Sequence, residues 1–419
     1  VLFVTRVKLD IQVHSEEEIF FGLGAESAAP RTRFFVLPAV VITTTLLLAA
    51  LSLPLGRLLV ALPPLRAYAI DIGGSLAGIA LYTALSAART SPSVWFGVLA
   101  LFLVLIDLGG VAASRLSRAG PLVTSAAMIA VILVCRSSAG SAAGREEWSP
   151  YYRLRLVDGA VPRIDANGVP LQFMQPMQAK ARSLSGSAYY GQAYAWFPGR
   201  TFDSVLVVGA GSGTDTALAL ARGAAHVDAV ELDPVIVDFG RTHHPDRPYA
   251  SDRVSVHVDD GRNFLRTTPR TYDLVVFALP DSLTLLSGSA ILRLESFLFT
   301  EEAFRGVRER LAPGGVFVMY NFYRQPWLVK KIAGMLERSF GHPPLVRFAE
   351  SGALAVFAAG PAVAALNGGP PPGSAVSPVA GEVPEPATDD WPFLYLKKRG
   401  VPAHYLAGLA LVLVFAVIL

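Results

Sequence analysis

The sequence predicts an α/β protein in which a small β-hairpin module precedes a doubly wound, mostly parallel sheet, with transmembrane helices on both sides. Three observations predict this organisation. A strand, a glycine-rich turn, a helix and a second strand follow one another over Val205–Pro234. Strand and helix patterns alternate from there to Phe340. Long apolar runs with almost no charge lie before and after this region.

The first strand and helix of the sheet are marked by composition. Ser204–Val208 is a short aliphatic run that is typical of a buried strand, and Thr214–Arg222 contains good helix formers. His226–Glu231 then predicts a second strand that ends on an acid. An acid at that distance from the turn lies at the tip of the second strand, where it can bind ribose hydroxyls. We therefore expect a nucleotide site at Glu231.

Glycines fill the turn between this strand and helix, at Gly209, Gly211 and Gly213. A backbone that turns sharply while a ligand presses on it has no room for a Cβ atom. A dinucleotide site has the pattern G-x-G-x-x-G, whose last glycine would fall at Thr214. The G-x-G-x-G pattern of this chain instead resembles the first motif of S-adenosylmethionine-type enzymes.

Further strands and helices complete the sheet, and acids follow two of the strands. Val254–Val258 and Tyr272–Ala278 read as strands. The acids Asp260 and Asp281 follow them, and Gly261 comes directly after the first. The carboxyl ends of parallel strands meet at one edge of a sheet, so these acids, the glycines and Glu231 should lie together. The sequence also predicts helices over 300–311 and 327–340, and a strand over 316–320 that follows a turn over 312–315.

Composition indicates that part of the chain lies in lipid. The 419 residues are 52% hydrophobic and only 16% charged, whereas soluble domains carry about 25% charged residues. A net charge of +3 gives no support for a nucleic-acid partner. The single cysteine, Cys135, excludes a disulfide framework and a cysteine-based metal site. Because the chain begins with Val1 and stops inside an apolar run, we expect a fragment.

The predicted domains follow from these patterns. An N-terminal flank (1–33) precedes about four transmembrane helices (34–137), and a last, short span follows near the end (403–419). Between them we expect a β module (145–200), the sheet domain (201–358), a linker rich in Pro, Gly and Ala (359–388) and a juxtamembrane segment (389–402). The basic residues that flank the spans favour a cytoplasmic soluble domain on a multi-pass protein of the inner membrane.

Several motifs in order resemble the spermidine synthase (aminopropyltransferase) family: VLVVGAGSG, VELDP, VHVDDGRNFL, YDLVVFALPD and LAPGGVFV. The preceding SPYYRLRLVD and IDANGVPLQF resemble the family's N-terminal β-hairpin module. The flanking spans and TDDWPFLYL resemble membrane-fused spermidine synthase-like proteins of bacteria. This resemblance implies a Rossmann-like, methyltransferase-type fold. It also implies decarboxylated S-adenosylmethionine or S-adenosylmethionine as co-substrate, without a metal.

The resemblance assigns roles to residues by position. The stretch Gly209–Gly213 would hold the methionine-derived chain of the co-substrate, and Glu231 would bind the ribose hydroxyls. Asp260 would contact the adenine amino group, and Gly261 would allow its close approach. Asp281 matches the catalytic aspartate, which would orient and deprotonate the attacking amine. A turn former in Pro-Asp-Ser is the alternative interpretation of Asp281.

The chain departs from the family at positions that bind the amine. Ser212 stands where the family has an aspartate that grips the free amine of the co-substrate. The family's Tyr-His-Glu stretch reads Tyr190-Gly191-Gln192 here, and Gln172 lies in the hairpin module. We therefore expect a weakened selectivity for polyamines, with Gln172, Tyr190 and Gln192 as candidate substrate-binding residues.

Two further stretches invite a functional interpretation. Asp389 and Asp390 could fold back on the pocket and supply the missing carboxylates, or their segment could be an aromatic membrane anchor. His243 and His244 suggest a metal, but adjacent histidines rarely point at one ion, and a solvated loop is the preferred interpretation.

The favoured function is aminopropyl transfer to an amine acceptor of the polyamine type, by a membrane-anchored transferase. One alternative is a methyltransferase on the same fold, which Ser212 favours. Another is a membrane transporter or sensor with a degenerate nucleotide-binding domain. The expected partners are the amine, the lipid bilayer and, in one possible assembly, a second copy of the chain.

Overall fold

The computed structural model describes residues 59–108, 144–180, 189–278, 296–323, 326–348, 354–366 and 382–401, with isolated residues between and beyond these ranges. The chain divides into two compact units. The first contains residues 22–173 and 233–239, and the second contains 174–232 and the chain from 240 onward, apart from short N-terminal pieces assigned to each. Each unit is considered by itself below.

The first unit contains a four-stranded antiparallel sheet in the order β1-β2-β3-β4. Its strands are β1 (Arg145–Trp148), β2 (Arg153–Val157), β3 (Arg163–Ala166) and β4 (Val169–Phe173). Leu154, Leu156 and Ile164 are almost fully buried at alternate positions, as expected for a sheet with one covered face. The hairpin module predicted from the sequence is confirmed.

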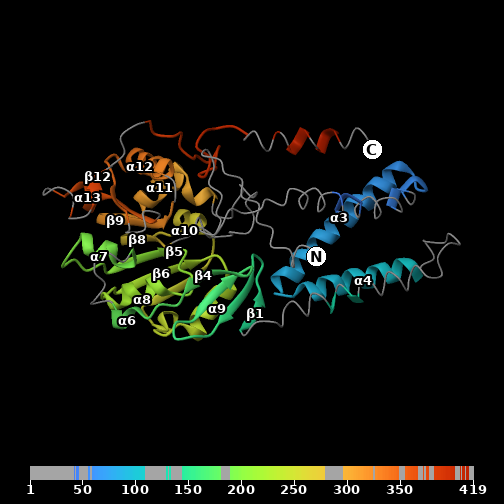
Figure 1. Cartoon of the computed structure of the whole chain (residues 1–419), viewed down its shortest axis with the longest axis horizontal. Helices are drawn as coiled ribbons and strands as arrows, with labels where there is room; N and C mark the ends of the chain where they lie inside the picture. The colour runs from blue at the N-terminus through green and yellow to red at the C-terminus, as the bar shows by residue number, and fades with distance from the viewer. Residues whose placement is uncertain are drawn as a thin grey trace, which may run out of the picture. The chain divides into compact units, whose positions relative to one another are not determined.

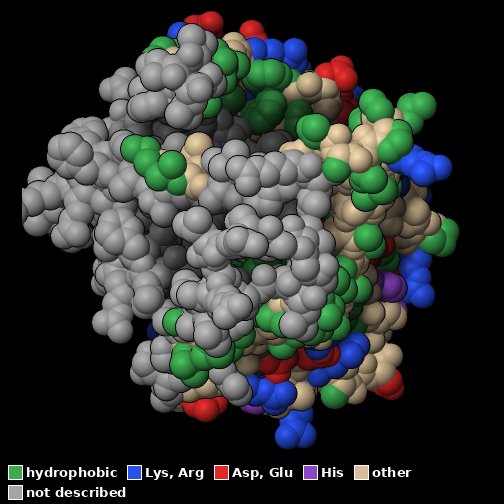
Figure 2. Space-filling view, turned by 90° about the vertical axis from the view of Figure 1, so that its right-hand side faces the viewer, with side chains coloured by type: hydrophobic (Ala, Val, Ile, Leu, Met, Phe, Trp, Pro, Cys, Tyr) green, Lys and Arg blue, Asp and Glu red, His purple; other side chains and the backbone are tan. Residues whose placement is uncertain are grey.

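Two apolar helices also belong to the first unit, α3 (Pro64–Ala87) and α4 (Pro92–Leu108). Among the described residues, α3 alone is both long and apolar enough to cross a membrane, judged by length and composition. Large apolar side chains stand exposed on it, such as Leu65 (85%) and Ile79 (65%). The edge-on contacts of Trp95 with Tyr82 and with Trp148 join α4 to α3 and to β1. Most of the other predicted spans lie outside the described residues. In the space-filling view of Figure 2, hydrophobic side chains reach the surface among the described residues, while charged ones lie mostly toward the outer edge.

The second unit is built on an eight-stranded sheet in the order β12-β10-β11-β9-β8-β5-β6-β7. Strands β5 to β9 pair in parallel with one another, and β11, β10 and β12 add an antiparallel edge that begins at β9. The strands are β5 (Ser204–Val208), β6 (His226–Glu231), β7 (Val254–Val258), β8 (Tyr272–Ala278), β9 (Leu311–Phe322), β10 (Leu345–Phe348), β11 (Leu354–Ala359) and β12 (Ala375–Val376). This confirms the Rossmann-like α/β fold.

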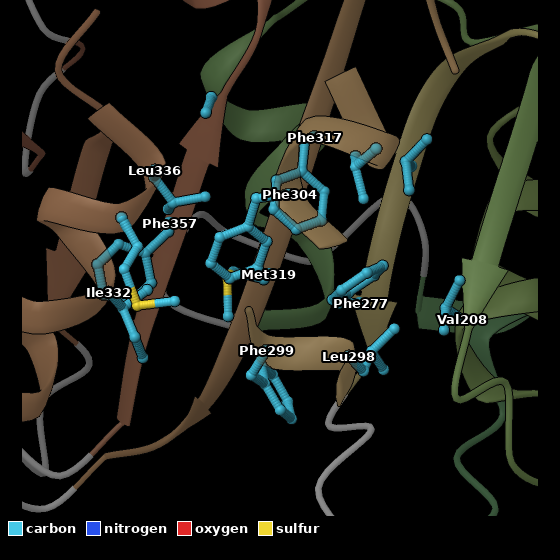
Figure 3. Packing of buried hydrophobic residues seen from close by; sticks show 14 of the residues in the cluster. Val208, Phe277, Leu298, Phe299, Phe304, Phe317, Met319, Ile332, Leu336 and Phe357 are labelled. Atoms are coloured by element: carbon cyan, nitrogen blue, oxygen red, sulfur yellow. The ribbon is translucent and has the colours of Figure 1, made fainter. Parts of the chain in front are cut away.

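Helices cover both faces of this sheet (Figure 1). On one face, α10, α11 and α12 pack on the large hydrophobic core; Figure 3 shows Phe277, Phe317 and Met319 of the strands meeting Phe304, Ile332 and Leu336 of these helices. On the other face lies α8, beside the short helices α6 and α7. The helices and 3-10 turns are α6 (Met177–Lys180), η1 (Tyr189–Gly191), α7 (Gln192–Trp196), α8 (Thr214–Ala221), α9 (Pro234–His243), η2 (Pro248–Ala250), α10 (Gly261–Thr267), η3 (Ser296–Phe299), α11 (Glu301–Glu309), α12 (Pro326–Phe340) and α13 (Pro361–Ala364).

The structure differs from the sequence prediction in two places. Residues 312–315, predicted as a turn, lie inside β9, because Leu311 pairs with Tyr272 before an irregularity in the register. The Pro-, Gly- and Ala-rich stretch 359–388, predicted as a linker, contributes α13 and β12, which pairs with β10. Proline and glycine are frequent in linkers, but they also tolerate short edge strands.

Candidate active site

The glycine loop between β5 and α8 turns through backbone conformations that favour glycine. Gly209, Gly211 and Gly213 have φ angles of 73°, 57° and 105°. A Cβ atom on Gly213 would also lie 2.5 Å from the Pro248 ring. The loop therefore needs glycine at these positions, as the sequence pattern predicted.

Two side chains fix this loop from opposite sides. At the end of β6, the Glu231 carboxylate accepts a hydrogen bond of 2.8 Å from the Gly211 amide. The buried Tyr249 hydroxyl donates to the Gly211 carbonyl at 2.7 Å. Ser212 lies next to this residue and is fully buried. The acid predicted to bind ribose thus lies directly beside the glycine loop, and it also organises the loop.

Asp260 and Gly261 form the start of α10, after β7. The Asp260 carboxylate caps the helix by accepting from the Asn263 amide at 2.9 Å. The Asp259 carboxylate beside it accepts from the Asn263 side-chain amide at 3.1 Å. A Cβ atom on Gly261 would lie 2.4 Å from the Val208 side chain, so α10 can approach β5 this closely only with glycine there.

The loop, Glu231 and Asp260 therefore stand at the carboxyl ends of three adjacent parallel strands, β5, β6 and β7. This edge offers backbone amides and two carboxylates within one site. Carboxylates of this kind accept hydrogen bonds from sugar hydroxyls and amino groups, which a nucleoside presents. The structure thus brings together seven of the residues predicted for the co-substrate: Gly209, Gly211, Ser212, Gly213, Glu231, Asp260 and Gly261.

The residues predicted to bind substrate are more dispersed. Asp281 lies outside the described residues, and Gln172 lies in β4 of the first unit. Tyr190 is in η1. Gln192 begins α7, is 1% exposed and accepts a hydrogen bond of 3.0 Å from Arg347 through its side-chain oxygen. The side-chain oxygen of Gln192 is therefore engaged within the fold, whereas its side-chain nitrogen is buried without a hydrogen-bond partner among the described residues.

Asp389 is held against the domain by α10 and by the start of α11. Its carboxylate accepts hydrogen bonds of 2.8 Å from the Arg262 guanidinium and of 2.8 Å from the Thr300 hydroxyl. Its amide donates to Glu302 at 3.0 Å. Asp389 and Asp390 are both exposed. An amine that binds Asp389 must therefore compete with Arg262.

The histidine pair is not a solvated loop. His243 ends α9, and His244 is 2% exposed. Its Nδ1 accepts from the Asp246 amide at 3.1 Å, and its Nε2 lies 3.4 Å from the Thr214 hydroxyl. Burial lowers the pKa of His244 to about 4, so the ring is neutral at pH 7. Among the described residues, no three His, Cys, Asp or Glu side chains are grouped to hold a metal ion.

Sequence reasoning missed one acid near this edge, Asp215 in the first turn of α8. The Tyr320 hydroxyl of β9 reaches both of its carboxylate oxygens, at 2.6 and 2.7 Å. Burial raises the pKa of Asp215 to about 7, although the bond from Tyr320 lowers it. The sequence signal was an acid amid the apolar residues of α8, two positions after the last glycine of the loop.

Comparison with known proteins matches one part of the chain to a known family. Residues 197–344 match the family model described as the spermine/spermidine synthase domain. The matched range begins just before β5 and ends just before β10, so it contains the loop, Glu231, Asp260 and Asp215.

Individual relatives agree with this assignment over part of their length. A polyamine aminopropyltransferase of Klebsiella pneumoniae is 31% identical over 121 residues, which is 28% of this chain and 39% of that protein. A polyamine aminopropyltransferase 2 of Hyperthermus butylicus is 30% identical over 118 residues, or 27% and 36%. The chain thus spans about two fifths of the length of these curated relatives.

Solved structures show weaker likenesses. A probable spermidine synthase from Corynebacterium glutamicum has a TM-score of 0.39 at 19% identity, covering 52% of this chain and 80% of that one. Human methyltransferase-like protein 13 has a TM-score of 0.31 at 21% identity, covering 38% and 71%. The assignment of the spermidine synthase domain therefore rests on the sequence match.

Proposed function

We propose that the chain is a membrane-anchored transferase that moves an aminopropyl group from decarboxylated S-adenosylmethionine to an amine acceptor of the polyamine type. The observation that carries this proposal is the position of the family match. It falls on the segment whose glycine loop, Glu231 and Asp260 meet at the carboxyl edge of the sheet. The curated relatives that match part of the chain are named polyamine aminopropyltransferases.

The chemistry requires a positioned, unprotonated amine more than it requires an electrophilic catalyst. The amine nitrogen attacks the carbon of the aminopropyl chain that is bonded to the sulfonium sulfur. A carbon–nitrogen bond forms, the carbon–sulfur bond breaks, and methylthioadenosine leaves as a neutral thioether. The nitrogen then releases one proton, for which Asp281 is the proposed acceptor.

A methyltransferase is the second candidate, and Ser212 favours it. A neutral serine does not repel the carboxylate of ordinary S-adenosylmethionine, as an aspartate at this position would. The two functions differ in the bond that breaks at sulfur, so they differ in the nucleoside product. Methyl transfer releases S-adenosylhomocysteine, and aminopropyl transfer releases methylthioadenosine.

Product analysis on the purified full chain tests this proposal. The protein is incubated with putrescine and either nucleoside, and the products are separated by chromatography and mass spectrometry. Methylthioadenosine formed from the decarboxylated nucleoside, together with an acceptor heavier by one aminopropyl group, supports the proposal. S-adenosylhomocysteine alone would establish the methyltransferase. If the protein forms neither product and binds neither nucleoside, a transporter or sensor with a degenerate domain becomes the better hypothesis.

The membrane anchor is part of the same proposal, with a cytoplasmic catalytic domain at the inner membrane. It is supported by the length and exposed apolar surface of α3 and by the uncharged runs of the sequence. Alkaline carbonate extraction of membranes from expressing cells provides the test. Retention in the membrane pellet is expected, and release into the supernatant would contradict the anchor. Protection of the catalytic domain from external protease in intact spheroplasts would support the cytoplasmic orientation.

A further inference from the structure

A carboxylate and a tyrosine hydroxyl meet at the carboxyl edge of β9, on the face of the sheet that α8 covers. Asp215 belongs to the first turn of α8, and Tyr320 stands near the end of β9, 105 residues later. The Tyr320 hydroxyl is within 2.7 Å of each carboxylate oxygen. Tyr320 is 1% exposed, whereas Asp215 is only half-buried. The Tyr320 hydroxyl is therefore the hydrogen-bond partner that the described residues provide for this carboxylate.

Two further tyrosines form a wall beside this pair. The rings of Tyr189 and Tyr190 in η1 lie 4.2 Å apart, and they lie 5.1 and 6.0 Å from the Tyr320 ring. With Tyr194, these rings and Asp215 line a small recess of about 10 Å³, which is room for a group the size of one water molecule or one ammonium. The floor of the recess is apolar and comes from β5, β8 and β9. It consists of Val205, Val207, Val276 and Val318.

Among the described residues, no basic side chain balances the charge of Asp215 in this recess. Among the described residues, no Lys, Arg or His side chain forms an ion pair with Asp215, and Tyr320 donates its hydrogen bonds. Burial raises the pKa of Tyr189, Tyr190 and Tyr320, and Asp215 raises each further, so the phenols stay neutral. The Arg222 guanidinium lies over the Tyr194 ring at 5.2 Å and is the basic group beside this wall.

The glycine loop itself supplies no carboxylate at this point. Ser212 is fully buried and neutral, and Glu231 on the opposite side of the loop is bonded to the Gly211 amide. Asp215 is the next acid along the chain, less than one helical turn after Ser212. A carboxylate framed by aromatic faces is a favourable site for an ammonium group, which is attracted both by the charge and by the ring quadrupoles.

We propose that Asp215, with Tyr189, Tyr190 and Tyr320, forms a subsite for a primary ammonium group. This inference deepens the proposed function and rests on it, because both reactants of aminopropyl transfer carry such a group. The ammonium can be that of the aminopropyl chain on the nucleoside, or one end of a diamine acceptor. Asp215 is then a binding residue that determines specificity.

The subsite predicts a proton linkage. An unoccupied Asp215 is about half protonated near pH 7, whereas a bound ammonium favours the ionised carboxylate. Binding of the ammonium near pH 7 should therefore release a fraction of a proton from Asp215. A residue with a purely structural role would not produce this release.

The experiment is isothermal titration of the full chain with three probes: decarboxylated S-adenosylmethionine, methylthioadenosine, and putrescine added after saturation with methylthioadenosine. The Asp215→Asn variant is compared with the wild type and with Asp252→Asn, which removes an exposed acid. Titrations in two buffers of different ionisation enthalpy measure the proton release. A melting curve of each variant confirms that it is folded.

The two sources of the ammonium give different outcomes. If the nucleoside supplies it, Asp215→Asn should weaken decarboxylated S-adenosylmethionine by about 10- to 100-fold and leave methylthioadenosine unchanged. If the acceptor supplies it, the loss should appear for putrescine instead. In either case the proton release should disappear in Asp215→Asn and persist in Asp252→Asn. Unchanged affinity for both ammonium-bearing probes, or an equal loss for methylthioadenosine, would overturn the subsite.

Two further results keep the test decisive. If Asp215→Asn does not fold, Tyr189→Leu removes one aromatic face without touching the acid, and should weaken the same probe several-fold without affecting methylthioadenosine. A wild-type protein that binds neither nucleoside would refute the proposed function. Putrescine binding that depends on Asp215 would then still support the subsite, and binding that is insensitive to Asp215 would refute it.

Discussion

The carboxyl edge of the large sheet has two halves that differ in how their polar groups are held. At β5, β6 and β7, side chains bond to nearby backbone: Glu231 to the Gly211 amide and Asp260 to the Asn263 amide. At β8 and β9, Asp215 is held by the side chain of Tyr320 and walled by Tyr189 and Tyr190. The first half consists of residues that the sequence analysis predicted, whereas Asp215 and Tyr320 of the second half were found only in the structure. We expect the first half to bind the nucleoside and the second to bind the amine, and four predictions test this division.

The largest effect should come from Asp281, which the sequence places after β8. Asp281→Asn removes the proposed proton acceptor, so turnover should fall by about 10²- to 10⁴-fold. Binding of methylthioadenosine should be unchanged, because the nucleoside half is intact. Steady-state kinetics and titration of the same preparation measure the two quantities. A variant that keeps its turnover would show that Asp281 is only a turn former.

Glu231→Gln tests the half of the sheet edge that we expect to bind the nucleoside. The Gln side-chain oxygen can still accept from the Gly211 amide, so the loop should keep its conformation, but the charged acceptor for ribose is lost. We expect methylthioadenosine and decarboxylated S-adenosylmethionine to weaken by the same factor, about 10- to 100-fold. An effect on only one of them would contradict the division, and Asp252→Asn is the control.

Gly240, which lies outside the glycine motif, packs closely against the glycine loop. A Cβ atom on Gly240 of α9 would lie 2.5 Å from the Ser212 carbonyl oxygen and 2.8 Å from the Tyr249 ring. Gly240→Ala should therefore cost about 1–3 kcal/mol of unfolding free energy and should also weaken the nucleoside. Gly306→Ala in α11 meets no atom within 4 Å and should be neutral or slightly stabilising. Thermal melts with and without methylthioadenosine would measure both effects.

The last prediction concerns the pH dependence of stability. Burial raises the pKa of Asp215 from 3.8 to about 7 in the folded chain. Between these values the folded chain holds a proton that the unfolded chain has released, so this contribution is complete below pH 4 and lost above pH 7. The free energy of unfolding of the wild type, relative to Asp215→Asn, should fall with rising pH by at most about 1.4 kcal/mol per pH unit. Chemical denaturation of both proteins at several pH values would measure it, and parallel profiles would contradict the assignment.

The sequence predicted the nucleoside half well because its contacts lie within a local motif. The strand limits of β5, β6, β7 and β8 agree with those predicted. The glycine pattern also predicted the sharp turn that the loop makes with positive φ angles. The capping role of Asp260 also depends on a residue only three positions away.

The amine half could not be predicted in the same way, because its partners are distant along the chain. The bond between Asp215 and Tyr320 joins α8 to β9, and an acid early in a helix reads as an ordinary first-turn residue. His244 was misjudged because its burial is not visible in the sequence, and one partner of its ring, Thr214, lies 30 residues earlier. The sequence analysis predicted none of β10, β11 and β12, which are short antiparallel strands with little periodic signal.

The contacts that hold the stretch 385–399 on the domain limit the distance between the domain and a bilayer. The Lys331 ammonium, almost fully buried in α12, donates to the carbonyls of Phe393 and Leu396, and Arg262 holds Asp389. If the apolar residues from Ala403 onward lie in lipid, only six residues separate them from Leu396. A connection of this length spans at most about 25 Å, so the domain would stay in the water layer at the membrane surface rather than in bulk solution. The enzyme would then bind its acceptor at the concentration found in this water layer. A polycation that anionic headgroups concentrate there would be the favoured acceptor.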